Sequence, residues 1–186
     1  MLTIFISPHN HQITTADGQT MIVKGMFLRE AGGFVSLFDY QPPKDLNDVQ
    51  IVLVRKYRKN KILSLPTDLK QAILSFLRDH HAQIDMSFDC YAFANLVKGV
   101  EVHKVPYMIA FWERKKKPWL PQPGSVVFYG TGETQFHHAA IYLGAGLYIS
   151  VYGAGGNLEI ATHRNMMRDY RAKHACLAEP LEEPLV

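Results

Sequence analysis

Apolar residues change their spacing along the chain near Pro66. Before that point, short apolar segments alternate with turn-forming residues, a pattern that is typical of β-strands. After it, apolar residues recur at helical spacing, and Thr67 or Asp68 is available to cap the helix start. The pattern predicts a small β-rich unit over residues 1–64, with strands at 2–6, 20–28, 33–39 and 49–54, and then a helix at 67–81.

A second helix is expected to begin at Cys90. The apolar residues that follow fall on one helical face, Asp89 is a suitable N-cap, and Gly99 can end the helix. A helix N-terminus favours thiolate over thiol and offers amide donors to an oxyanion, so Cys90 is a candidate nucleophile. An Asp89 carboxylate aimed at the sulfur would instead raise the thiol pKa, whereas as a cap it would face the amides. The other cysteine, Cys176, is interpreted as a small buried hydrophobic residue.

Strand-like segments return after residue 123, at 125–129, 138–143, 147–152 and 158–161. Tight glycine turns between them predict an antiparallel meander. Helices followed by such a sheet give an α+β fold, with a second domain expected over residues 65–186.

The paired histidines lie at the start of one of these strands. Strand alternation separates His137 from His138 and puts His137 on the face whose other residues look like core packing. On the next strand, Tyr148, Ser150 and Tyr152 share one face. That polar face is the one expected to meet an imidazole, and His137 remains the alternative to His138 as the functional histidine.

Composition narrows the classes of partner. The 186 residues are 47% hydrophobic, enough for one well-packed core, and the formal net charge is only +3. The basic run at 114–117 is interpreted as a solvated loop, so nucleic acid is not an expected partner. Two cysteines define no disulfide framework. His9 and His11 have no further ligands at a useful spacing and are interpreted as surface residues, so no metal and no other cofactor is expected.

The N-terminal segment begins apolar but lacks basic residues and stops at Pro8. It therefore does not resemble a Sec-type signal peptide. Apolar stretches also fall short of the ~20 residues that a membrane span requires. We expect a soluble protein that is either cytoplasmic or exported by a route without such a signal.

Several short motifs between residues 65 and 165 resemble, in their order and spacing, those of NlpC-type cysteine peptidases. The motifs are Phe88-Asp89-Cys90, the segments 123–128, 138–144 and 146–149, and the glycines before Leu158. Those papain-like enzymes mostly cut peptides of the bacterial cell wall. The resemblance implies helices packed on a curled antiparallel sheet, with Cys90 as nucleophile, His138 as base and Ser150 as the third polar residue.

Other positions depart from the family pattern. Tyr91 and Ala92 follow the nucleophile in place of serine and glycine, and Ser125 stands where aspartate is common. The tyrosine and glycine pair that usually precedes the nucleophile is missing. Ser150 is also a weaker acceptor than the usual histidine or asparagine. The resemblance is therefore to a divergent member.

Together these residues predict a thiol hydrolase that cleaves a peptide or isopeptide amide through an acyl-enzyme on Cys90. The resemblance suggests a peptidoglycan stem peptide, or muropeptide, as substrate. Two alternatives remain open: a transferase or deamidase using the same thioester chemistry, and a catalytically weakened domain that serves as a binding module.

Overall fold

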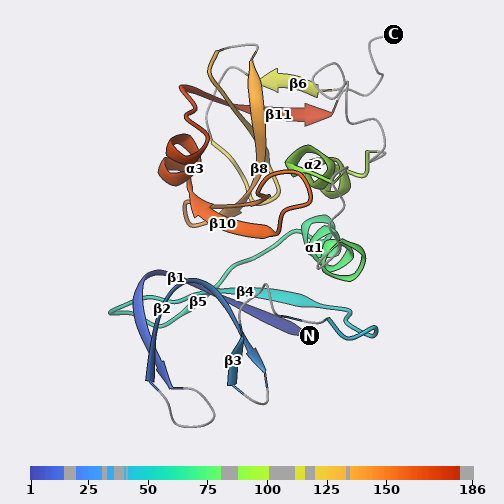
Figure 1. Ribbon diagram of the computed structural model, residues 1–186. Helices are drawn as coiled ribbons and strands as arrows, with labels where there is room; N and C mark the ends of the chain where they lie inside the picture. The colour runs from blue at the N-terminus through green and yellow to red at the C-terminus, as the bar shows by residue number, and fades with distance from the viewer. Residues whose placement is uncertain are drawn as a thin grey trace.

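The computed structural model describes residues 1–14, 20–30, 33–35, 40, 42–80, 88–100, 112–115, 120–132 and 135–180. Within these ranges, two β-sheets and three α-helices give a mixed α+β architecture, as the sequence predicted (Figure 1). The first sheet is built from residues before Leu63 and the second from residues after residue 111.

The first sheet has the strand order β3-β2-β1-β4-β5. Only β1 and β4 pair in parallel among its described strands. The strands are β1 (Leu2–Thr14), β2 (Thr20–Glu30), β3 (Gly33–Val35), β4 (Val49–Leu53) and β5 (Lys61–Ile62).

The prediction that the first strand ends at residue 6 is wrong, because β1 continues past Pro8. Its register with β2 shifts between Ser7 and His11. Such an irregularity accommodates a proline, which has no amide hydrogen to give to the ladder. His9 and His11 were predicted to be surface residues, but their side chains lie outside the described part of the structure.

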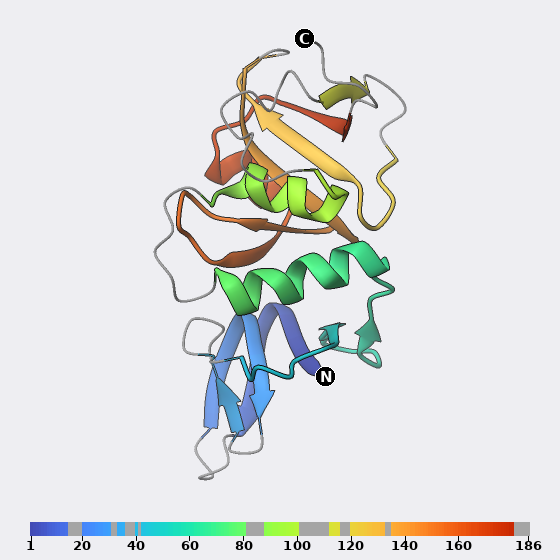
Figure 2. The ribbon, with the colours of Figure 1, turned by 90° about the vertical axis from the view of Figure 1, so that its right-hand side faces the viewer.

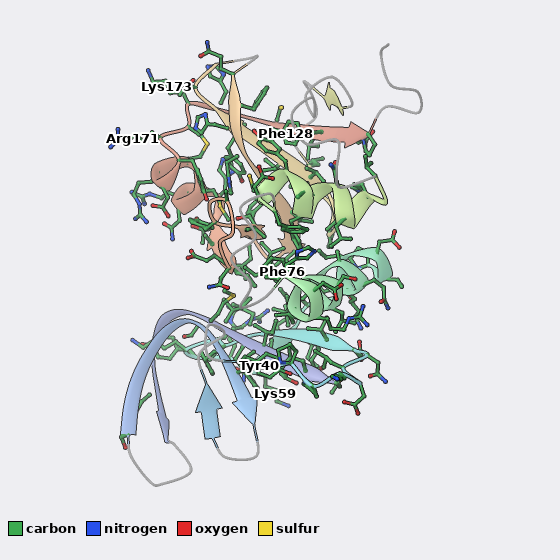
Figure 3. The ribbon with its side chains drawn as sticks, turned by 45° about the vertical axis from the view of Figure 1, so that its right-hand side comes forward. Tyr40, Lys59, Phe76, Phe128, Arg171 and Lys173 are labelled. Atoms are coloured by element: carbon green, nitrogen blue, oxygen red, sulfur yellow. The ribbon has the colours of Figure 1, made fainter. Side chains whose placement is uncertain are left out.

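Helix α1 (Thr67–Asp79) lies between the two sheets (Figure 2). Its apolar stripe is buried, and Phe76 lies where the two layers meet (Figure 3). The predicted caps Thr67 and Asp68 are wrong. Pro66 is the N-cap and makes no side-chain cap hydrogen bond; its ring packs where a side chain at Gly124 would stand. This contact fixes the start of α1 against the second sheet.

The second sheet has the order β10-β9-β8-β7-β11-β6, and each of its pairs is antiparallel. The predicted meander is confirmed as β7 to β10, whereas β6, β11 and the short helix α3 were not predicted. The elements are β6 (Trp112–Lys115), β7 (Val126–Gly130), β8 (Phe136–Gly144), β9 (Leu147–Val151), β10 (Leu158–Thr162), α3 (His163–Asp169) and β11 (His174–Pro180).

Helix α2 (Cys90–Lys98) packs on one face of this sheet, against β8 and β9. The opposite face carries a second apolar cluster that includes Tyr129, Tyr148 and Met166 of α3. The sheet is thus covered on both sides. One core cluster includes Ile4 of the first sheet, Phe76 of α1 and Phe93 of α2. The division into domains at residue 64 stays a prediction.

Two basic runs differ from the sequence interpretation. Arg114 and Lys115 lie in β6, so the predicted loop is wrong for these two residues, and Lys116 and Lys117 lie outside the described ranges. A longer run, which the sequence interpretation did not include, spans residues 55–61, from the connection after β4 to the start of β5, and includes Lys59 (Figure 3). Its side chains from Lys56 to Lys61 are exposed.

None of the helices in the described ranges has the length and apolar character that crossing a bilayer would need.

Candidate active site

Cys90 is the first residue of α2, as predicted. The Asp89 carboxylate accepts hydrogen bonds from the backbone amides of Tyr91 and Ala92, each at 2.9 Å. These contacts satisfy two of the amides that a helix start leaves unpaired. The Gly155 amide also donates to the Phe88 carbonyl at 2.9 Å, which ties the turn after β9 to the chain just before the cysteine. Hydrogen bonds therefore fix the backbone both just before and just after Cys90.

That turn depends on its glycines. Gly153 and Gly155 have φ angles of +75° and +65°, a region that residues with a side chain rarely adopt. A Cβ atom at Gly156 would overlap the Tyr152 carbonyl. These glycines allow the chain to double back tightly enough to reach Phe88.

The Cys90 thiol is only 7% exposed. Burial raises its pKa to about 12, and the nearby Asp89 carboxylate acts in the same direction. Hydrogen-bonding amides of Ala139, Cys90 and Tyr91 lower the pKa but do not overcome burial. The amides of the helix start act toward the thiolate, as expected, but desolvation of a charged sulfur outweighs them in the pKa of the buried thiol.

His138 lies on β8 and is 1% exposed. Its Nε2 atom lies 3.0 Å from the Ser150 hydroxyl on β9, and Ser150 is itself fully buried. The predicted alternation is confirmed from Ala139 onward, because Ala139 and Ile141 pack in the core cluster with α2, whereas Ala140 belongs to the cluster on the opposite face. His137, near the start of β8, is exposed. His138 and Ser150 are thus brought together as the sequence suggested.

The Cys90 thiol lies against the backbone of β8, the strand that carries His138. The amide of Ala139, which acts on the thiol, belongs to the residue directly after His138. Among the described residues, no hydrogen bond joins the thiol to the imidazole. The Cys90 thiol therefore lies against the backbone next to His138, whereas the rings that contact the imidazole, those of Tyr152 and Tyr170, belong to the apolar cluster on the other face of the sheet.

Burial also controls the charge of the imidazole. It lowers the pKa of His138 to about 3, and the charge of His137 contributes in the same direction. With the thiol pKa near 12, both groups are neutral at pH 7. The pair rests as thiol and imidazole rather than as thiolate and imidazolium.

Aromatic rings surround this imidazole. The Tyr170 ring, just after α3, stacks on His138 with centroids 3.5 Å apart and planes inclined by 10°. The Tyr152 ring approaches edge-on at 5.6 Å, while its hydroxyl donates to the sulfur of Met166 at 3.4 Å. Tyr170 was not predicted, because it belongs to no motif and follows a helix too short to leave a clear apolar pattern.

Cys176 lies apart from this cluster, on β11 opposite Phe128 of β7. It is half-buried, in keeping with its interpretation as a packing residue, and it forms no disulfide with Cys90. The described residues contain no group of three or more histidine, cysteine, aspartate or glutamate side chains arranged to hold a metal ion.

Comparison with known proteins identifies a family over the part of the chain that holds Cys90 and His138. No curated protein matches it. Among solved structures, an NlpC/P60 family protein from Bacillus cereus ATCC 10987 is similar, with 14% sequence identity and a TM-score of 0.34. The match covers 86% of this chain and 57% of that one, so the chain spans less than two thirds of that protein. The sequence model of the NlpC/P60 family matches residues 78–177. This segment is more than half of the chain and holds Cys90, His138 and Ser150. The chain belongs to the NlpC/P60 family.

Proposed function

We propose that this protein is a thiol hydrolase that cleaves a peptide or isopeptide amide through an acyl-enzyme on Cys90. The NlpC/P60 family generally comprises cysteine peptidases and amidases. The observation that carries the proposal is the placement of a thiol at a helix start, against the backbone beside a buried histidine that is itself hydrogen-bonded to Ser150. A nucleophile, a base and an orienting group are the parts that such catalysis requires.

The two imidazole nitrogens have separate roles in this proposal. Nε2 is engaged by the Ser150 hydroxyl, so Nδ1 is the nitrogen left to exchange a proton with the thiol. For Nδ1 to accept that proton, Nε2 carries the hydrogen and donates it to Ser150. The Ser150 hydroxyl can accept that hydrogen, so its position is compatible with the tautomer in which His138 is a base.

The reaction begins from the neutral pair. Sγ of Cys90 bonds to the acyl carbon as His138 takes the thiol proton, and His138 then gives that proton to the leaving amine. Water next attacks the thioester, His138 removes a proton from it, and Cys90 leaves as the thiol. Because neither group is charged at rest, proton transfer accompanies the attack instead of preceding it.

The helix start supplies the donor for the developing oxyanion. Asp89 already engages the amides of Tyr91 and Ala92. The amide of Cys90 itself is not engaged by Asp89 and is the proposed donor to the substrate oxygen, where the positive end of α2 adds to its effect. In this proposal, the amides of Tyr91 and Ala92 bind the cap, and the amide of Cys90 binds the oxyanion.

For the substrate, we propose a stem peptide of peptidoglycan, which is the substrate class suggested by the family. A second candidate function is a weakened domain that binds such peptides without cleaving them. The deeply buried thiol, with its pKa near 12, is the observation that favours it.

Purified muropeptides incubated with the protein and followed by mass spectrometry test the first proposal. We expect a mass gain of one water for each bond cleaved, lost in Cys90→Ala and kept in Cys176→Ala. Exchange of the amide for an added labelled amine would indicate acyl transfer instead. Unchanged muropeptides that nevertheless bind to the protein, with equal affinity for Cys90→Ala, would replace the hydrolase by the binding module.

A further inference from the structure

We propose that Tyr170 is a positioning residue for His138, and that its ring fixes the plane of the imidazole. This inference rests on the proposed role of His138 as the base. It assigns a function to a residue outside the family motifs, on the turn that follows α3.

The geometry of this contact differs from that of the neighbouring rings. Tyr170 lies face to face with His138, at 3.5 Å and 10°, whereas Tyr152 and Tyr129 approach it at 5.6 Å and 65° and at 6.2 Å and 43°. Aromatic pairs generally prefer offset or edge-to-face arrangements with centroids about 4.5–7 Å apart. A closer and nearly parallel stack therefore indicates a contact imposed by the surrounding fold.

His138 needs such a contact because Ser150 alone does not fix its ring. A single hydrogen bond at Nε2 restrains that atom, but it leaves the ring able to rotate about an axis through it. The hydroxyl is also uncharged, so the bond is weaker than one to a carboxylate. A flat surface against the ring removes the remaining rotation and fixes the direction of Nδ1, the nitrogen that must meet the thiol.

Tyr170 is itself held in place. The Nε2 atom of His137 lies 2.7 Å from the Tyr170 carbonyl oxygen, and the Tyr170 amide donates to the carbonyl of Met166, a fully buried residue of α3, at 3.1 Å. Arg171 follows on the same turn (Figure 3). Its φ of +47° is a left-handed conformation that residues with a side chain rarely adopt unless their surroundings impose it. The adjacent histidines thus have complementary roles, since His138 bears the chemistry and His137 anchors the residue stacked on it.

The position of the phenol agrees with this arrangement. Burial is the largest cause that raises the pKa of Tyr170, followed by the charges of Tyr152 and Cys90. The Tyr170 side chain therefore lies near both members of the proposed catalytic pair. The inference assigns the positioning to the ring and not to the hydroxyl, which makes Tyr170→Phe the conservative variant.

The test compares Tyr170→Leu and Tyr170→Phe with a matched control, Tyr142→Leu. Tyr142 is another half-buried tyrosine over the same sheet face, and its ring contacts Tyr148 instead of His138. Three quantities are measured: kcat and KM on purified muropeptides, the rate of Cys90 alkylation by iodoacetamide at pH 7, and the thermal unfolding midpoint. Alkylation needs no substrate, so it reports on the thiol and imidazole pair even if muropeptides are not cleaved.

We expect Tyr170→Leu to lower kcat by about 100-fold with little change in KM, the loss typical of a catalytic group misplaced by about 1 Å. Alkylation should slow in parallel, because the imidazole no longer receives the thiol proton efficiently. Tyr170→Phe should stay within about threefold of the unmodified protein, since a flat ring remains. Tyr170→Met, which keeps a bulky apolar side chain without a flat ring, should resemble Tyr170→Leu and provides the same comparison if the leucine variant does not fold.

Two results would overturn the inference. The first is a decrease in kcat and in alkylation rate that, in both Tyr170→Leu and Tyr170→Met, is no larger than the decrease in Tyr142→Leu, with equal unfolding midpoints in the three variants. The other is a loss in Tyr170→Phe as large as in Tyr170→Leu, which would assign the effect to the hydroxyl. Other results would contradict the proposed function and leave this inference standing. They are activity retained in Cys90→Ala, or uncleaved muropeptides together with the expected order of alkylation rates among the Tyr170 variants.

Discussion

The Nε2 atom of His138 lies 3.0 Å from the Ser150 hydroxyl, and both side chains are buried between β8 and β9. A serine in this position orients the imidazole without placing a negative charge beside it. In the proposed reaction, the imidazolium would therefore gain little electrostatic stabilisation, and the site should behave nearly as a dyad of Cys90 and His138.

Ser150→Ala should lower kcat only about tenfold, on the order of 1.4 kcal/mol of barrier, because the Tyr170 stack still restrains the ring. Steady-state kinetics on the purified variant check this. A loss as large as that of His138→Ala would mean that the hydroxyl is indispensable. Ser150→Asn supplies a stronger acceptor, but Ser150 is fully buried, so we expect a lower unfolding midpoint from overpacking.

The two adjacent histidines should differ in the size of their effects. His138→Ala should abolish turnover, because no other group in the described site is placed to take the thiol proton. His137→Ala removes the contact at the Tyr170 carbonyl, worth about 1 kcal/mol for a typical hydrogen bond, so we expect a loss of about fivefold. Parallel assays of both variants decide the ranking, and the reverse order would reassign the base to His137.

The charge of Asp89 should restrain the reactivity of Cys90. Its carboxylate raises the thiol pKa, whereas its oxygen also caps α2. Asp89→Asn removes the charge and keeps an oxygen acceptor for the cap, so alkylation of Cys90 by iodoacetamide at pH 7 should become faster. Asp89→Ala is the control, because it should also lose about 1 kcal/mol of stability with the cap.

A full pH profile of the same alkylation reports the thiol pKa directly. In the unmodified protein, the rate should be low at pH 7 and climb steadily toward pH 12, because the raised pKa leaves little thiolate at neutral pH. A plateau reached below pH 8 would contradict the burial described for Cys90.

Stability should fall as the solution is made acidic. The His138 pKa is about 3 in the folded state and near 6.5 when the chain is unfolded, so between these values the unfolded chain binds the extra proton. The free energy of unfolding should then decrease by up to about 1.4 kcal/mol for each pH unit as pH falls from 6.5 to 3. Burial lowers the pKa of His163 in the same direction, so the contribution of His138 is measured as the difference from His138→Gln. Equal acid sensitivity of the two proteins in urea titrations would show that His138 is not buried in its neutral form.

Local signals in the sequence determined much of the site. Asp89 and Gly99 mark the ends of α2 by capping chemistry, which depends only on a few neighbouring residues. The faces of β8 and β9 follow from the two-residue period of a strand, so Ser150 could be assigned to the face expected to meet the imidazole before its contact with His138 was known. These features are local, because backbone geometry transmits them over one turn or one strand.

Only the tertiary structure decided the protonation of Cys90 and the aromatic contact of His138. The helix start that favours a thiolate is a local effect, but burial of Cys90 under the packed fold is larger and reverses it. Tyr170 reaches His138 because α3 brings the chain back over the second sheet, and no spacing in the sequence encodes that return. Sequence thus determined the ends of α2 and the face of the sheet that carries His138 and Ser150, whereas packing between distant segments determined the burial of Cys90 and His138 and which ring lies against the imidazole.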